Sequence, residues 1–235
     1  MSNQTVVPPG GQFQLPATST EPLLAFRCSP AFRPYLEEDA KHAAFVIDTP
    51  LVYRYIQGAS PISLSSSDPN SSDSECDDLG TVDVTISIGG QVHAKAEVPL
   101  NATGYEIPLD VSSLVAQKTR YNVTCQATYQ AETSSSSEQQ FSTNASLLYL
   151  PDTDGSVVKT DLRTGALWVR PADGKGGDFK PFVPQGFYVS FDQYLAKNLS
   201  LIDQLKVDGF NTVRFFTSAL LSKAHVFADT RNPSL

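Results

Sequence analysis

The stretch DFKPFVPQGFYVSFDQYLAKNLSLIDQLKVDGFNTVRFF, residues 178–216, has the pattern of a strand, a helix and a second strand. PFVPQGFYVS predicts the first strand, and Asp192 is placed to cap the helix YLAKNLSLIDQLKVD. Four apolar residues recur there at helical spacing: Leu195, Leu199, Ile202 and Leu205. Gly209 predicts the end of the helix, and FNTVRFF predicts a buried second strand. A parallel unit of this kind begins an α/β domain but does not complete one, because parallel strands need cover on both faces.

The region before this unit, from about Glu21 to Leu150, has the short alternating runs of an all-β fold. Its clearest element is TVDVTISIGGQVHAKAEV, in which Gly89 and Gly90 supply the positive φ that a two-residue hairpin turn requires. Eight side chains should face inward: Val82, Val84, Ile86, Ile88, Val92, Ala94, Ala96 and Val98. Strands at this spacing predict a β-sandwich that is immunoglobulin-like or jelly-roll-like in architecture. A true immunoglobulin domain is not indicated, since position 123 is Val and Trp168 lies outside the region.

The run YNVTCQATY continues the alternation and predicts that Cys125 faces inward while Asn122 faces solvent. ASLLYL predicts the last strand of the region, with Asn144 in the loop before it. Of the three cysteines, Cys28 and Cys125 lie on apolar strand faces, whereas Cys76 lies in an acidic, Ser-rich stretch. We therefore expect a Cys28–Cys125 disulfide, the alternative being three reduced thiols.

Further along the chain, SVVKTDLRTGALWVR predicts a second hairpin around Arg163, Thr164 and Gly165. The glycine-rich ADGKGGD that follows lacks the Lys-Ser/Thr pair of a phosphate loop and is interpreted as a surface turn. No Cys/His cluster favours zinc, and we expect neither a metal nor a cofactor.

The formal net charge of −8 disfavours nucleic acid and anionic membranes as partners. No apolar run is long enough to span a bilayer. Six Asn-X-Ser/Thr sequons favour secretion, to the extracellular space or cell wall, and we expect glycosylation at Asn101, Asn122 and Asn144. The polar N-terminus does not have the pattern of a signal peptide, so a signal would have to lie upstream of Met1.

Residues 145–216 resemble the start of the (β/α)₈ barrel of secreted fungal glycoside hydrolase-like proteins, in which a β-sandwich precedes the barrel. The motifs that carry the resemblance are P-x-G-F-Y at Pro184–Tyr188 and G-F-N-T-V-R at Gly209–Arg214. It implies hydrolysis of glycosidic bonds by two carboxylates on the fourth and seventh strands. Because the chain supplies two strands, we assign no catalytic residue and expect it to be inactive by itself.

The resemblance also implies three substrate-binding candidates, Arg214, Tyr188 and Asp192, at the active face of such a barrel. Each has a structural alternative: a salt-bridged strand end for Arg214, packing for Tyr188 and a helix cap for Asp192.

The expected organisation is a mainly β chain with four parts: a disordered lead at 1–21, a β-sandwich at 22–150, a hairpin and linker at 151–177, and a truncated barrel start at 178–235.

A second hypothesis is a non-catalytic module that binds carbohydrate or cell wall. Tyr53 and Tyr55 have the alternation to share one strand face, where they would either stack on sugars or belong to the core. A third is a barely folded product, because two lone barrel strands leave apolar faces uncovered.

Overall fold

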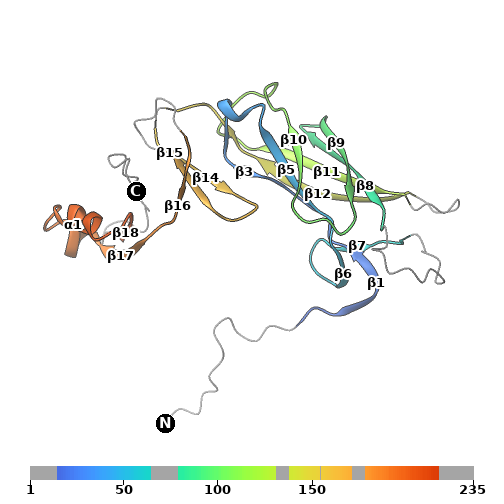
Figure 1. Ribbon diagram of the computed structural model, residues 1–235, viewed down its shortest axis with the longest axis horizontal. Coiled ribbons are helices and arrows are strands. Elements are labelled where there is room, and N and C mark those ends of the chain that lie inside the picture. Colours follow the sequence, from blue (N-terminus) through green and yellow to red (C-terminus); the bar gives the residue numbers. More distant parts are fainter. Residues whose placement is uncertain (1–14, 65–78, 131–137, 154, 171–177, 217–235) are drawn as a thin grey trace, which may run out of the picture. The chain divides into compact units, whose positions relative to one another are not determined.

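The computed structural model describes residues 15–64, 79–130, 138–153, 155–170 and 178–216 (Figure 1). These residues form a mainly β structure with several antiparallel sheets and short helices, and they contain no closed barrel. The chain divides into two compact units that are not continuous in sequence. The first comprises Met1–Pro30, Ala44–Val111 and Tyr121–Ser146, and the second Ala31–Ala43, Ser112–Arg120 and Leu147–Leu235.

The first unit contains three sheets, ordered β6-β1-β7, β10-β5-β2 and β12-β11-β8-β9. Their strands are β1 (Thr18–Leu24), β2 (Arg27–Pro30), β5 (Ala43–Asp48), β6 (Leu51–Arg54), β7 (Ser60–Pro61), β8 (Thr81–Ile88), β9 (Gln91–Pro99), β10 (Tyr105–Leu109), β11 (Tyr121–Tyr129) and β12 (Gln139–Leu147). β1 begins inside the stretch that was expected to be disordered, while residues 1–14 of that stretch lie outside the described residues.

The predicted hairpin is confirmed as β8 and β9, and Gly89 and Gly90 have φ values of 58° and 86°. The inward position expected for Val92 is wrong, because Val92 is exposed. The pairing shifts between Ile86 and Ser87, so that β9 carries an extra residue, His93, at this point. This bulge places Val92 opposite Ser87 and turns it away from the apolar face.

The alternation predicted for β11 is confirmed, with Val123, Cys125, Ala127 and Tyr129 buried. The disulfide between Cys28 and Cys125 is also confirmed. It joins β2 of the β10-β5-β2 sheet to β11 of the β12-β11-β8-β9 sheet, across 97 residues of sequence. Cys76, the third cysteine, lies outside the described residues.

The second unit contains sheets of order β13-β4, β16-β15-β14-β3 and β17-β18. Its elements are β3 (Phe32–Arg33), β4 (Tyr35–Leu36), the 3₁₀ turn η1 (Glu37–Asp39), β13 (Tyr149–Leu150), β14 (Val157–Asp161), β15 (Leu167–Arg170), β16 (Lys180–Phe182), β17 (Gly186–Ser190), the π-helix η2 (Phe191–Leu195), α1 (Leu201–Val207) and β18 (Thr212–Phe216). The second predicted hairpin is confirmed as β14 and β15, with Gly165 at φ 75°.

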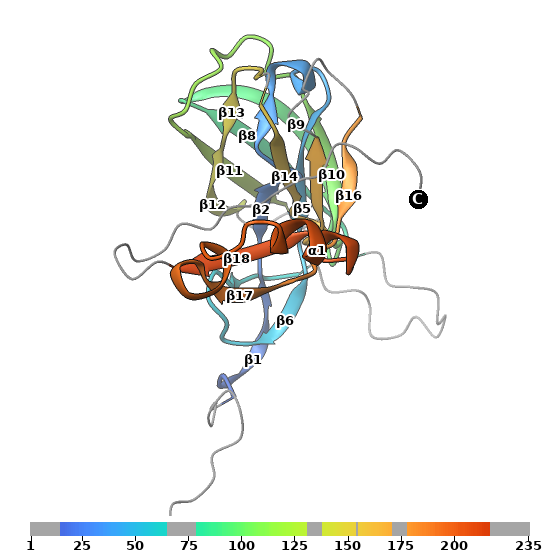
Figure 2. The same ribbon diagram turned by 90° about the vertical axis from the view of Figure 1, so that its left-hand side faces the viewer.

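The strand-helix-strand pattern is confirmed, because β17 and β18 pair in parallel (Figure 2). The single helix expected over residues 194–208 is wrong: η2 and α1 are separate, and Leu199 between them is exposed. Asn198 interrupts the helix by accepting hydrogen bonds from the Ser200 N–H at 3.1 Å and from its hydroxyl at 2.7 Å. A small apolar cluster, formed by Leu195, Leu205 and Val213, nevertheless joins both helical segments to the strands.

Candidate functional site

The first candidate site is the face of the β17–β18 pair that lies opposite α1. Phe187, Val189 and Val213 pack with the apolar residues of η2 and α1. Because successive side chains of a strand point to opposite faces, Tyr188 and Arg214 project from the other face. Both side chains are exposed, Tyr188 to 68%.

Tyr188 and Arg214 are direct partners in the parallel register, and their side chains interact. Arg214 Nη1 donates a hydrogen bond to Tyr188 Oη at 2.7 Å, and Arg214 Cζ lies 5.0 Å from the centre of the tyrosine ring. The structure thus brings together two of the three residues that the resemblance suggested. Their exposed surface offers a guanidinium and a phenol side by side, groups that can bond the hydroxyl or carboxylate oxygens of a ligand.

The register of these strands is set by Gly186 and Asn211, which belong to the two sequence motifs. A Cβ at Gly186 would lie 1.7 Å from the Thr212 carbonyl oxygen, so the close approach of the strands requires glycine. Asn211 Oδ1 accepts the Gln185 N–H at 2.7 Å, and Asn211 Nδ2 donates to the Val183 carbonyl at 2.9 Å. Gly186 and Asn211 therefore help to position Tyr188 beside Arg214.

Asp192, the third candidate, lies in the first turn of η2, directly after the carboxyl end of β17, and is exposed. The expectation that it caps the helix is wrong. Ser190 is the N-cap, because its side chain accepts the Gln193 N–H at 3.3 Å.

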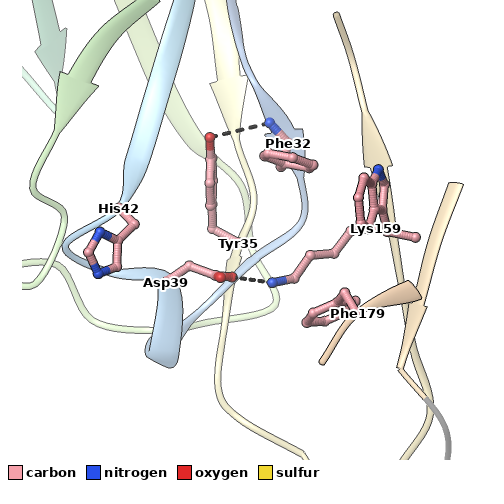
Figure 3. A pocket seen from close by; sticks show the side chains of 7 residues that line it. Phe32, Tyr35, Asp39, His42, Lys159 and Phe179 are labelled. Carbon is pink, nitrogen blue, oxygen red and sulfur yellow. Dashed lines mark hydrogen bonds and ion pairs between the residues drawn. The ribbon is translucent and has the colours of Figure 1, made fainter. Parts of the chain in front are cut away.

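A second candidate site, which the sequence did not suggest, is a cavity of about 270 Å³ within the second unit (Figure 3). It is lined by four aromatic and three polar side chains: Phe32, Tyr35, Trp168, Phe179, Asp39, His42 and Lys159. We call it the aromatic pocket.

Two buried cations, Lys159 and Arg170, lie close to the Phe179 ring in the wall of the aromatic pocket. Lys159, whose side chain is 7% exposed, places Nζ 2.6 Å from Asp39 Oδ2 and 3.8 Å from the centre of the Phe179 ring. Arg170 places Nη1 2.5 Å from Glu38 Oε1 and Cζ 5.0 Å from the same ring centre. Each cation therefore has both a carboxylate and an aromatic face as partners, which makes its burial tolerable.

Sequence reasoning missed the aromatic pocket because its residues lie far apart in the chain. Lys159 and Asp39 are separated by 120 residues. Lys159 also shares the buried face of β14 with Val157 and Asp161, where alternation gives no reason to expect a lysine. The one signal was the chain's single tryptophan, Trp168, a residue type enriched in ligand sites.

The three expected glycosylation sites are all exposed. Asn122 lies on the outward side of β11, as expected. The loop position expected for Asn144 is wrong, because Asn144 lies within β12 and its Oδ1 is 3.4 Å from the Thr124 hydroxyl. Asn101 has a φ of 63° and accepts the Leu51 N–H at 3.4 Å. Glycosylation at these residues remains a prediction.

Within the described residues, no cluster of three or more His, Cys, Asp or Glu side chains is arranged to hold a metal. No helix in that part of the chain is long and apolar enough to cross a membrane.

No protein-family model matches the chain, and comparison with curated proteins and with solved structures also gave no match.

Proposed function

We propose that this chain is the carbohydrate-recognising part of a secreted glycoside hydrolase-like protein. The observation that carries the proposal is the hydrogen-bonded Tyr188–Arg214 pair, exposed on the strand face opposite the helices. In a (β/α)₈ barrel the helices cover the outside, the opposite strand faces point into the barrel, and the active site lies at the carboxyl ends of the strands. The β17–α1–β18 unit fits two neighbouring strands of such a barrel, with Asp192 following the carboxyl end of the first.

The proposed first domain is a β-sandwich at residues 22–150, followed by a hairpin and linker and then the barrel start. The disulfide between two sheets supports the sandwich, since inter-sheet disulfides are typical of immunoglobulin-like architectures. A disulfide also supports an extracellular or cell-wall location, because such bonds persist in oxidising compartments. We propose no catalytic carboxylate in this chain, so its own contribution is binding.

The proposal is tested by NMR titration of the ¹⁵N-labelled chain with oligosaccharides of glucose, mannose and xylose. At least one series should shift the β17 and β18 resonances. Tyr188→Ala and Arg214→Ala should each weaken that binding about tenfold, the loss expected for one charge-assisted or stacking contact. Tyr194→Ala is the matched control, because Tyr194 is also an exposed tyrosine of the second unit but lies on η2. If Tyr188→Ala and Arg214→Ala bound the oligosaccharide as tightly as Tyr194→Ala and the unaltered chain do, the proposal would be contradicted.

A second candidate is a binding surface on the first unit, favoured by the exposure of Tyr53 and Tyr55. These side chains are 57% and 59% exposed, so neither belongs to the core. They lie two residues apart, at and just after the end of β6, as stacking residues on one face would. An exposed aromatic pair of this kind suits a non-catalytic module that binds a polysaccharide surface.

Pull-down with insoluble polysaccharides tests this candidate. Tyr53→Ala combined with Tyr55→Ala should lower the bound fraction at least fivefold, while Tyr105→Ala should leave it unchanged. Tyr105 is the control because it is an exposed tyrosine of the same unit on a different strand. Retention by the double variant would exclude this surface and leave the Tyr188–Arg214 face as the carbohydrate contact.

A further inference from the structure

The turn between η2 and α1 contains an Asn-Leu-Ser sequon at residues 198–200. The helix expected over residues 194–208 would have placed Asn198 on its apolar stripe, where a bulky glycan cannot be accommodated. In the structure η2 ends at Leu195 and α1 begins at Leu201, and every residue between them is exposed. Asn198 is therefore accessible to modification.

The fold uses the Asn198 side chain through its oxygen alone. Oδ1 accepts the Ser200 N–H at 3.1 Å and the Ser200 hydroxyl at 2.7 Å. The Asn198 N–H donates to the Leu195 carbonyl, and the Asn198 carbonyl accepts the Leu201 N–H, both at 3.2 Å. Nδ2 forms no hydrogen bond with any residue that the structure describes. Because aspartate can form the same kind of turn, the turn does not explain why this residue is an asparagine.

Ser200 is also not used as its place in the fold suggests. It stands at the N-cap position of α1, yet its side chain makes no capping hydrogen bond. Its hydroxyl instead lies at bonding distance from the amide that would accept a glycan, as no other sequon in the described part of the chain arranges. The Asn101 and Asn144 amide oxygens bond to groups outside their own sequons.

The geometry of this sequon is local. Both hydrogen bonds to Asn198 Oδ1 join residues two positions apart and require no tertiary contact. The turn can therefore form in a chain that is being exported and has not yet folded. Its exposure in the structure shows that the completed fold has room for the glycan.

We propose that Asn198 is an N-glycosylation site. In the transfer step, Nδ2 attacks C1 of a lipid-linked oligosaccharide: the Nδ2–C1 bond forms, the bond from C1 to the pyrophosphate oxygen breaks, and the lipid pyrophosphate leaves. The amide gives up one proton, and no atom is oxidised or reduced. The modification rests on the proposed secretion, because the transferase acts in the secretory pathway.

A glycan on Asn198 leaves the proposed binding face uncovered. Leu195 before the turn and Leu201 after it belong to the apolar cluster on one side of the β17–β18 pair. Tyr188 and Arg214 project from the opposite side. The modification therefore does not compete with carbohydrate binding at that face.

The test is expression of the full chain in yeast behind a cleavable export signal, which makes the result independent of the native location. Peptide-N-glycosidase in H₂¹⁸O converts each glycosylated asparagine to ¹⁸O-labelled aspartate. Trypsin cleaves after Lys197 and Lys206, so mass spectrometry reads this sequon on a peptide of its own, residues 198–206. That peptide should carry the label.

Ser200→Ala removes the hydroxyl and should remove the label, whereas the matched variant Ser200→Thr keeps a hydroxyl and should keep the label. Asn198→Asp retains the oxygen that forms the turn, so it should lose one glycan from the mass of the secreted chain without a change in its circular dichroism. An unlabelled peptide 198–206 from the unaltered chain would overturn the proposal, whether or not Asn122 is labelled. A label that persists in Ser200→Ala would overturn it too. A labelled peptide from a chain that binds no oligosaccharide would count against the proposed function alone.

Discussion

The two units of the chain bury different kinds of side chain. In the described part of the first unit, the buried residues are apolar apart from Thr49, and a disulfide links two of the sheets. The second unit buries three charged residues, Lys159, Asp161 and Arg170, each with an oppositely charged partner. The difference indicates that the first unit is stabilised by apolar burial and a cross-link, and that the second also depends on paired charges.

The largest effect should come from removing the cross-link of the first unit. The Cys28→Ser, Cys125→Ser double variant should lose about 4 to 5 kcal/mol of unfolding free energy, because the disulfide closes a loop of nearly a hundred residues. Chemical denaturation followed by circular dichroism measures the loss. A reductant should destabilise the unaltered chain by a similar amount and leave the double variant unchanged. If the variant were as stable as the unaltered chain, the cross-link would not be what distinguishes the first unit.

A core truncation in the same unit should have the next largest effect. Ile86 is fully buried on β8, so Ile86→Ala should cost about 2 to 4 kcal/mol through lost burial and the cavity that remains. Val92→Ala, on the exposed side of the β9 bulge, should change the unfolding free energy by less than about 0.5 kcal/mol. Equal losses for both variants would show that the bulge does not turn Val92 outward.

Breaking a charge pair should destabilise the second unit more modestly. Asp39→Asn leaves the Lys159 ammonium without its nearest carboxylate, and the cost should be about 2 kcal/mol, since Asp39 retains some solvent access. Hydrogen exchange resolved by mass spectrometry should show faster exchange in β14 and β15 but not in β8 and β11. The double variant Asp39→Leu, Lys159→Met should recover part of the loss, because both charges are then absent. Faster exchange throughout both units would contradict the contrast between them.

The smallest effect should be a pH dependence at Asp161. Hydrogen bonding to Arg163 holds the pKa of the Asp161 carboxyl below its ordinary value of 3.8. The pair therefore stabilises the fold above about pH 4, and this contribution is lost as the pH falls through the lower folded pKa. Acidification should accelerate exchange in the β14–β15 hairpin before it affects β8 and β11. Asp161→Asn should remove this dependence; its persistence in that variant would assign it to another group.

The elements that could be predicted from sequence are those governed by local patterns. Alternation placed Cys125 inward, and two adjacent glycines located the β8–β9 turn. Where a local competitor was present, the same reasoning failed: Asn198 divided the expected helix, and the bulge at His93 reversed Val92. The bulge does not change the composition or the period of the strand enough to be recognised from the sequence.

The sequence by itself determined the β-rich character, the two hairpins and the strand-helix-strand order at residues 178–216, and it favoured the Cys28–Cys125 disulfide over three reduced thiols. These features depend on periodicity and turn residues that act over a few positions. The tertiary structure alone decided that Tyr188 lies beside Arg214 and that Asp39 meets Lys159 next to Phe179 and Trp168. Such contacts join segments remote in sequence, and their formation depends on burial and charge pairing summed over the whole unit.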